Sequence, residues 1–226
     1  GAGWATAIVM TFLLICMAVY AQRSSTMRAL KLYSEFARVN IAAIVGILRL
    51  GVPIALNIAA EIMFFAIIPL MIAHLGSDVV AAHAIAINID SLAFMVPLGV
   101  ASALTIKVAM AEGAGDAKLA RRFCIVGYKL ALILGLGTAA LKIILREDLT
   151  QLFSADPKVQ LIATNLFLFA AVLGSVDCIQ MTASGALRGY KDVRIPLIIQ
   201  VVAFWVIAFP IAYTLALTDF WGEPMG

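Results

Sequence analysis

Residues 51–72 read GVPIALNIAAEIMFFAIIPLMI, an apolar run in which Glu61 is the one ionisable side chain. The hydrocarbon core of a bilayer is about 30 Å thick, and a helix needs about 20 apolar residues to cross it. This run therefore predicts a membrane-spanning helix. Six such stretches follow one another along the chain, at residues 2–22, 50–75, 78–107, 122–145, 158–187 and 195–217.

The composition supports the same interpretation. Of the 226 residues, 64% are hydrophobic and 13% are charged, and the mean hydropathy is +1.06. Ordinary soluble domains carry about 25% charged residues, so this composition excludes a soluble enzyme. We predict an all-α polytopic membrane protein with six transmembrane helices and with the lipid bilayer as its surroundings.

The positions of Lys and Arg predict the orientation of these helices. Basic residues collect in alternate connections, namely Arg23, Arg28, Lys31, Arg38 and Arg49 in the first, Lys107, Lys118, Arg121 and Arg122 in the third, and Arg188, Lys191 and Arg194 in the fifth. Such connections face the cytoplasm, so Gly1 and Gly226 are expected outside. Without a basic patch interleaved with aromatic residues, nucleic acid is not an expected partner.

The first connection, residues 23–48, carries apolar residues at helical spacing, including Met27, Leu30 and Ile41. This pattern predicts an amphipathic helix along the cytoplasmic face. Because long basic connections often join two helix bundles, we place a lobe boundary there. The three cysteines lie in separate predicted spans and show no disulfide or metal-binding spacing.

Acidic residues at bilayer depth carry most of the functional information, because such groups are costly and usually functional. Glu61 follows the cytoplasmic start of its helix near Gly51 by about 15 Å of helical rise, and Asp90 follows the outer start of its helix by about 18 Å. Asp177 lies about 16 Å from the cytoplasmic end at Arg188. The three carboxyl groups therefore share one level of the membrane.

Carboxyl groups at this depth can hold a proton or bind a cation, which is the chemistry of ion-coupled transport. Asn57 and Phe65 lie one turn to either side of Glu61, and the ring can add a cation–π contribution. Three polar residues, Gln180, Ser184 and Arg188, lie on the same face of their predicted helix as Asp177. His83 lies on the same face of its helix as Asp90. We expect these faces to line one cavity, and we expect Pro97 and Gly99 to form a hinge.

Each of these features also has a structural interpretation. The acids can serve as hydrogen-bonding groups between helices, and for Asp90 the neighbouring Asn88 and Ser91 can satisfy it locally. His83 lies near the outer end of its helix and is more often structural in such a position. Pro97 can equally be a static kink.

Several short motifs, in order along the chain, carry a family resemblance: GVP at 51–53 with Glu61, LG at 75–76 with VAAH at 80–83, FMVPLG at 94–99, GAGD at 113–116 and LRGYKD at 187–192. With these motifs the chain resembles the MATE family, the multidrug and toxic compound extrusion transporters, and in particular their bacterial branch. It departs from the family pattern at Ala84, where many members have an amide, and at Asp90, where a small polar residue is expected.

The resemblance implies a twelve-helix protein with two lobes, of which this chain covers helices six to eleven. Residues 1–22 would be the last helix of the N-terminal lobe, residues 23–48 the linker, and residues 49–226 the C-terminal lobe without its final helix. It further implies export of organic cations in exchange for Na⁺ or H⁺, with Glu61 and Asp177 as the ion-coupling positions and as the candidate Na⁺ ligands. It implies no cofactor beyond the coupling ion, no enzymatic activity, a monomeric full-length protein and location in the bacterial inner membrane.

Three other functions are alternatives to drug export. A lipid-linked oligosaccharide flippase of the same superfamily is the main alternative, but a diphosphate favours a basic cavity and the predicted cavity is acidic. Intramembrane proteolysis is disfavoured because Asp90 and Asp177 lack the Gly-x-Gly-Asp context, and Ser184 lacks a preceding glycine. A purely structural membrane protein is disfavoured by three acids at one depth.

Overall fold

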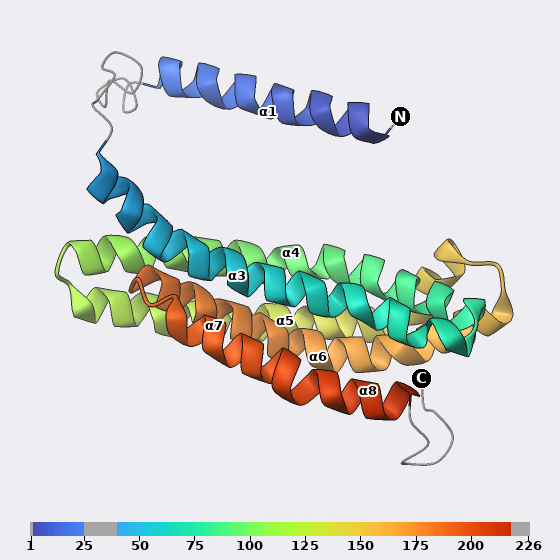
Figure 1. Cartoon of the computed structure of the whole chain (residues 1–226). Coiled ribbons are helices and arrows are strands. Elements are labelled where there is room, and N and C mark those ends of the chain that lie inside the picture. The colour runs from blue at the N-terminus through green and yellow to red at the C-terminus, as the bar shows by residue number, and fades with distance from the viewer. Residues whose placement is uncertain (1, 25–39, 218–226) are drawn as a thin grey trace. The chain divides into compact units, whose positions relative to one another are not determined.

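The computed structural model describes residues 2–24 and 40–217 of the chain. Its long helices are α1 (Ala2–Arg23), α3 (Ile41–Ile72), α4 (Ser77–Gly113), α5 (Ala117–Phe153) and α6 (Pro157–Gly189), and the last span consists of α7 (Arg194–Val201), the π-helical segment η2 (Val202–Ala208) and α8 (Phe209–Leu217). A short 3₁₀ turn, η1 (Ala73–Leu75), follows α3. These described residues contain no strand and six spans long and apolar enough to cross a membrane. The predicted all-α class and the six spans are confirmed (Figure 1).

The helices are longer than the sequence-based ranges. The second span begins at Ile41 rather than at residue 50, and α4 and α5 run to Gly113 and Phe153. Charged residues end a hydropathy run but not a helix, so these helices extend past the apolar stretch. Most of the predicted amphipathic connection, residues 25–39, lies outside the described part of the chain.

The chain divides into two compact units, Gly1–Val45 and Gly46–Gly226. The first contains α1, whose span has 0% of its most apolar window buried. The second contains most of α3 and all later helices, and it holds the cavities described below.

Side chains fix the ends of α5 and α6. Asp116 caps α5 by accepting a hydrogen bond from the Leu119 backbone N–H at 2.9 Å, and Asp156 caps α6 in the same way for Lys158 at 2.9 Å. Gly115, directly before the α5 cap, has a φ of +73°, a conformation that glycine adopts without steric cost. The connections on either side of α5 are therefore tight, and α4, α5 and α6 become neighbours.

Small residues bring α4, α5 and α6 into close contact. A Cβ atom at Gly185 of α6 would lie 2.6 Å from the Ala101 carbonyl oxygen of α4, and Thr105 Oγ1 donates to the Gly185 carbonyl at 2.7 Å. Gly127 of α5 faces Leu104 of α4 at similarly short range. Small residues and interhelical hydrogen bonds drive helix association in lipid, where the hydrophobic effect contributes little. These three helices form the most closely packed part of the second unit.

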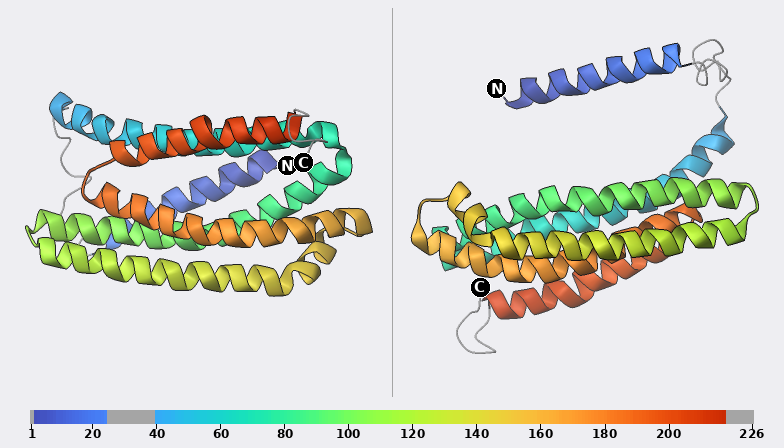
Figure 2. Two further views of the ribbon diagram at one scale, coloured as in Figure 1. Left: turned by 90° about the horizontal axis from the view of Figure 1, so that it is seen from below. Right: turned by 180° about the vertical axis from the view of Figure 1, so that it is seen from behind.

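Helix α3 and the last span lie side by side (Figure 2). Phe64 of α3 stacks on Phe204 with ring centroids 4.9 Å apart, and Trp205 Nε1 donates to the Ala60 carbonyl at 3.2 Å. Phe204 and Trp205 both lie in η2, which ends two residues before Pro210, a residue that has no backbone N–H to donate.

Candidate functional site

A cavity of about 480 Å³ lies between α3, α4 and α6. Its lining combines apolar walls with three acids and one base. The residues are Ile58, Glu61, Ile62 and Phe65 of α3, Ile87, Asp90, Ser91, Phe94, Met95 and Leu98 of α4, and Asp177, Met181 and Arg188 of α6. The structure thus brings the three membrane acids of the sequence analysis to one cavity.

Glu61 is held by a chain of amides that joins three helices. Gln200 of α7 donates from Nε2 to Glu61 Oε2 at 3.0 Å, and Gln180 of α6 donates from Nε2 to Gln200 Oε1 at 2.6 Å. Gln200 is buried, with 3% of its surface exposed. The partner of Glu61 is therefore a neutral group, and the carboxylate keeps its full charge when ionised.

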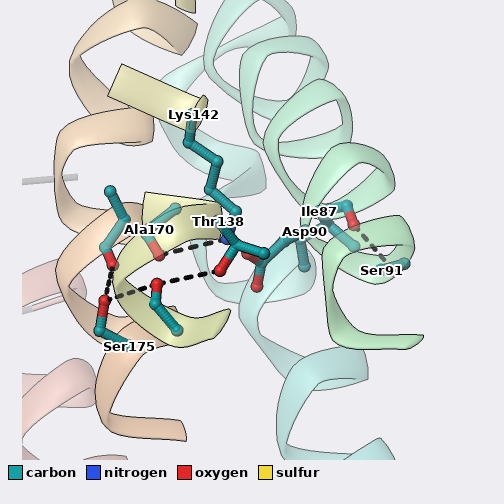
Figure 3. A network of polar contacts seen from close by, with 9 residues as sticks. Ile87, Asp90, Ser91, Thr138, Lys142, Ala170 and Ser175 are labelled. Atoms are coloured by element: carbon teal, nitrogen blue, oxygen red, sulfur yellow. Dashed lines mark hydrogen bonds and ion pairs between the residues drawn. The ribbon is translucent and has the colours of Figure 1, made fainter. Parts of the chain in front are cut away.

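Asp90 has a charged partner instead. Lys142 of α5 forms an ion pair with Asp90 Oδ1 of α4, and its ammonium also reaches the Ala170 carbonyl at 3.5 Å (Figure 3). The Lys142 side chain is 7% exposed, whereas the Asp90 side chain is 43% exposed. The base is enclosed by protein, and the acid faces the cavity.

A second, smaller cavity of about 20 Å³ lies beside this ion pair, large enough for about one water molecule. Thr138, Lys142 and Gly174 contribute to its lining, together with Asp90, Phe94 and Asp177, which also line the larger cavity. Asp177 thus stands between the two cavities, where it interacts electrostatically with Glu61, Asp90 and Lys142.

The remaining predicted cavity residues do not all share this lining. Phe65 lines the larger cavity, but Asn57 is buried and its Nδ2 lies 3.5 Å from the Pro196 carbonyl of α7. Four residues of an α-helix turn by about 400°, so positions 57, 61 and 65 drift round the helix by about 40° at each step. Asn57 lies at the edge that faces the last span, outside the cavity.

The face of Asp177 divides in a similar way. Arg188 lines the larger cavity, whereas Gln180 bonds Gln200 and Ser184 is buried beside Gly185, where α6 approaches α4. The structure thus does not place Asn57, Gln180 and Ser184 in the lining that the acids share, and a role for them in substrate binding stays a prediction.

The predicted hinge residues lie within one continuous helix. Pro97 is buried in α4 and lines the smaller cavity, while a Cβ atom at Gly99 would meet nothing within 4 Å. The hinge stays a prediction. On the same helix, His83 Nε2 is buried and finds no hydrogen-bond partner within the described residues.

Sequence reasoning missed Lys142 and Gln200. Lys142 is the one ionisable residue of the run 130–145, and Gln200 is the one amide of the run 195–209. Both signals are present in the sequence, but helical spacing relates an acid only to neighbours on its own helix, and these two partners come from other helices.

Comparison of the chain with models of protein families gives a clear match. A model of the MatE family matches residues 53–214, which include every residue of both cavities. The chain belongs to the MatE family. Together with its six spans, this membership makes it part of a multi-pass membrane protein.

Relatives of this MatE chain match it from end to end. It is 39% identical to the multidrug resistance protein PmpM of Pseudomonas aeruginosa over 226 residues, which is 100% of this chain and 47% of that protein. It is 39% identical to a probable multidrug resistance protein NorM of Chromobacterium violaceum and 40% identical to that of Shewanella oneidensis, covering 49% of each. The chain spans about half the length of these curated relatives.

Proposed function

We propose that the full-length protein containing this chain is a secondary antiporter that exports organic cations in exchange for Na⁺ or H⁺. The observation that carries this proposal is the acidic cavity between α3, α4 and α6. Its volume of about 480 Å³ lies in the range of small-molecule sites. The names of the relatives, which refer to multidrug resistance, support export as the direction.

The lining suits an aromatic cation. Apolar side chains such as Phe65, Phe94 and Met95 can cover a ring system, and Glu61 and Asp177 supply negative charge at the same depth. Among the described lining residues there are three acids and one base, Arg188, which favours a cation over the diphosphate of a lipid-linked sugar. We therefore favour drug export over a flippase, and transport over enzymatic chemistry.

In the proposed cycle, Glu61 and Asp177 bind the coupling ion and the substrate in turn. Because both ligands are cations, occupation by one disfavours the other, and alternating access carries them in opposite directions. The amide chain from Gln180 through Gln200 orients the Glu61 carboxylate. Glutamine can donate and accept, so this chain can rearrange when the charge of Glu61 changes.

The first test is Glu61→Gln in the full-length protein, with Glu112→Gln as its control, since Glu112 is an exposed acid near the end of α4. The substitution keeps the shape of Glu61 and removes its charge. We expect loss of ethidium resistance in cells that express the Glu61 variant at a normal level, and full resistance with the Glu112 variant. Unchanged resistance in the Glu61 variant would remove it from ion coupling.

A further inference from the structure

The charges at the cavity do not balance. Glu61, Asp90 and Asp177 are three carboxyl groups, and Arg188 is the base among the described lining residues of the larger cavity. Lys142 lies behind Asp90 in the wall of the smaller cavity. When all five groups are ionised, they leave the site with a net charge of one negative unit. Without Lys142 the net charge would be two negative units.

Lys142 is enclosed by protein and held in place. Its side chain is 7% exposed, and its ammonium contacts the Asp90 carboxylate and the Ala170 carbonyl. A Cβ atom at position 174 would lie 2.9 Å from Nζ, so Gly174 leaves the space that the ammonium occupies. A buried ammonium is stable only with such partners, which ties Lys142 to Asp90.

Asp90, in contrast, remains accessible from the larger cavity. Its side chain is 43% exposed and lines both cavities. A cation in the larger cavity would therefore meet this carboxylate, but with its charge already balanced by Lys142. Among the described residues Glu61 forms no ion pair: its hydrogen bond comes from Gln200, and Arg188 acts on it through a longer-range electrostatic interaction.

We infer that Lys142 selects the charge of the substrate, because it neutralises Asp90 and leaves a site matched to an organic cation with a single positive charge. This inference rests on the proposed function and narrows its substrate class. A dication would carry one charge more than the site can balance. The alternative is that the ion pair only joins α4 to α5, in which case its removal would affect all cations alike.

Two dyes with the same ring system separate these outcomes. Ethidium carries one positive charge, and propidium carries a second on its side chain. We would measure equilibrium binding of both dyes to the purified full-length protein by fluorescence. Lys142→Met removes the positive charge of the pair. Lys142→Gln also removes this charge, but its amide can still donate a hydrogen bond to Asp90. The second variant keeps the test available if the methionine variant fails to fold.

We expect either Lys142 variant to raise the affinity for propidium relative to ethidium by about tenfold. A tenfold change in affinity corresponds to the Coulomb energy of two unit charges about 12 Å apart in a medium of effective dielectric constant about 20. The double variant Asp90→Asn/Lys142→Met restores the original net charge and should restore the original preference. Lys129→Met removes a charge from an exposed position on the same helix and should leave the preference unchanged.

Each other outcome has a definite meaning. Equal changes for both dyes in the Lys142 variants, or an altered preference in the double variant, would overturn charge selection by Lys142 while leaving the proposed export function intact. Failure of the unmodified protein to bind either dye would overturn the proposed function as well as the inference.

Discussion

Two acids face the same cavity, yet they have opposite kinds of partner. Glu61 of α3 receives a hydrogen bond from the neutral Gln200, whereas Asp90 of α4 forms an ion pair with Lys142. A carboxylate with a neutral partner keeps its charge for a ligand, while one with an ammonium partner has that charge balanced inside the protein. We therefore expect the partner behind each acid, rather than its position along the cavity wall, to distinguish the roles of Glu61 and Asp90.

The two regions also differ in how easily they can rearrange. The amides of Gln180 and Gln200 can exchange donor and acceptor roles without leaving a charge unpaired. Separating Asp90 from Lys142 would strand an ammonium that is 7% exposed. We therefore expect the contacts between α3, α6 and α7 to change during transport, and the contact between α4 and α5 to persist.

The largest effect should come from Asp90→Asn, because it leaves the enclosed Lys142 ammonium without its counter-charge. Removal of one partner from a fully buried ion pair costs about 3 to 5 kcal/mol, and the cost here should be smaller because only the Lys142 side of the pair is enclosed. We expect a strongly lowered thermal unfolding temperature of the detergent-solubilised full-length protein. Glu61→Gln should change the same temperature much less, since an amide replaces a carboxylate whose partner is neutral.

The double variant Asp90→Asn/Lys142→Met is the control for this comparison. Neutral replacements of both members of a buried pair are often tolerated, so the double variant should be more stable than Asp90→Asn alone. Equal unfolding temperatures for Asp90→Asn and Glu61→Gln would contradict the comparison, because the loss of a charged partner and the loss of a charge beside a neutral partner would then cost the same stability.

The same comparison shows what could be predicted from the sequence. The six spans follow from hydropathy, because every backbone polar group in a membrane must be satisfied within its helix. The depth of Glu61, Asp90 and Asp177 follows from the fixed rise of an α-helix. Both are properties of one helix at a time. The structure confirms the six spans and places the three acids at one cavity.

Contacts between helices could not be predicted in this way. Gln200 lies 139 positions from Glu61, and Lys142 lies 52 positions from Asp90. Whether two such side chains meet depends on the rotation of each helix about its axis. A difference of about 40° in the direction that a residue faces is enough to take it out of contact, as Asn57 illustrates. The acids were therefore found, and the partners that distinguish them were missed.

An intermediate effect is expected from Gln200→Leu, which interrupts the amide chain. It leaves Gln180 and Glu61 without the hydrogen bonds that Gln200 makes, and an unsatisfied buried polar group costs about 1 to 3 kcal/mol. Thermal unfolding should detect this loss. Gln151→Leu, at an exposed position near the end of α5, is the matched control and should change little. A Gln200 variant as stable as its control would show that the chain does not hold Glu61.

The smallest effect tests whether Gly174 is required for the position of Lys142. A Cβ atom there would lie 2.9 Å from Lys142 Nζ and 3.8 Å from Asp90 Oδ1, so Gly174→Ala must displace the ammonium by a few tenths of an ångström. Alanine also stabilises a helix by about 0.5 to 1 kcal/mol relative to glycine. The two contributions oppose each other, and we expect a net change within about 1 kcal/mol.

Gly137→Ala separates the two contributions, because a Cβ atom at that position of α5 meets nothing within 4 Å. It should give the full helix-propensity gain, and the shortfall of Gly174→Ala relative to it measures the strain on the ion pair. The shortfall should disappear in the Lys142→Met background, where the flexible ammonium is absent. Equal stabilisation by both alanines in the unmodified protein would mean that the ammonium moves aside freely, and that Asp90 rather than Gly174 determines where Lys142 lies.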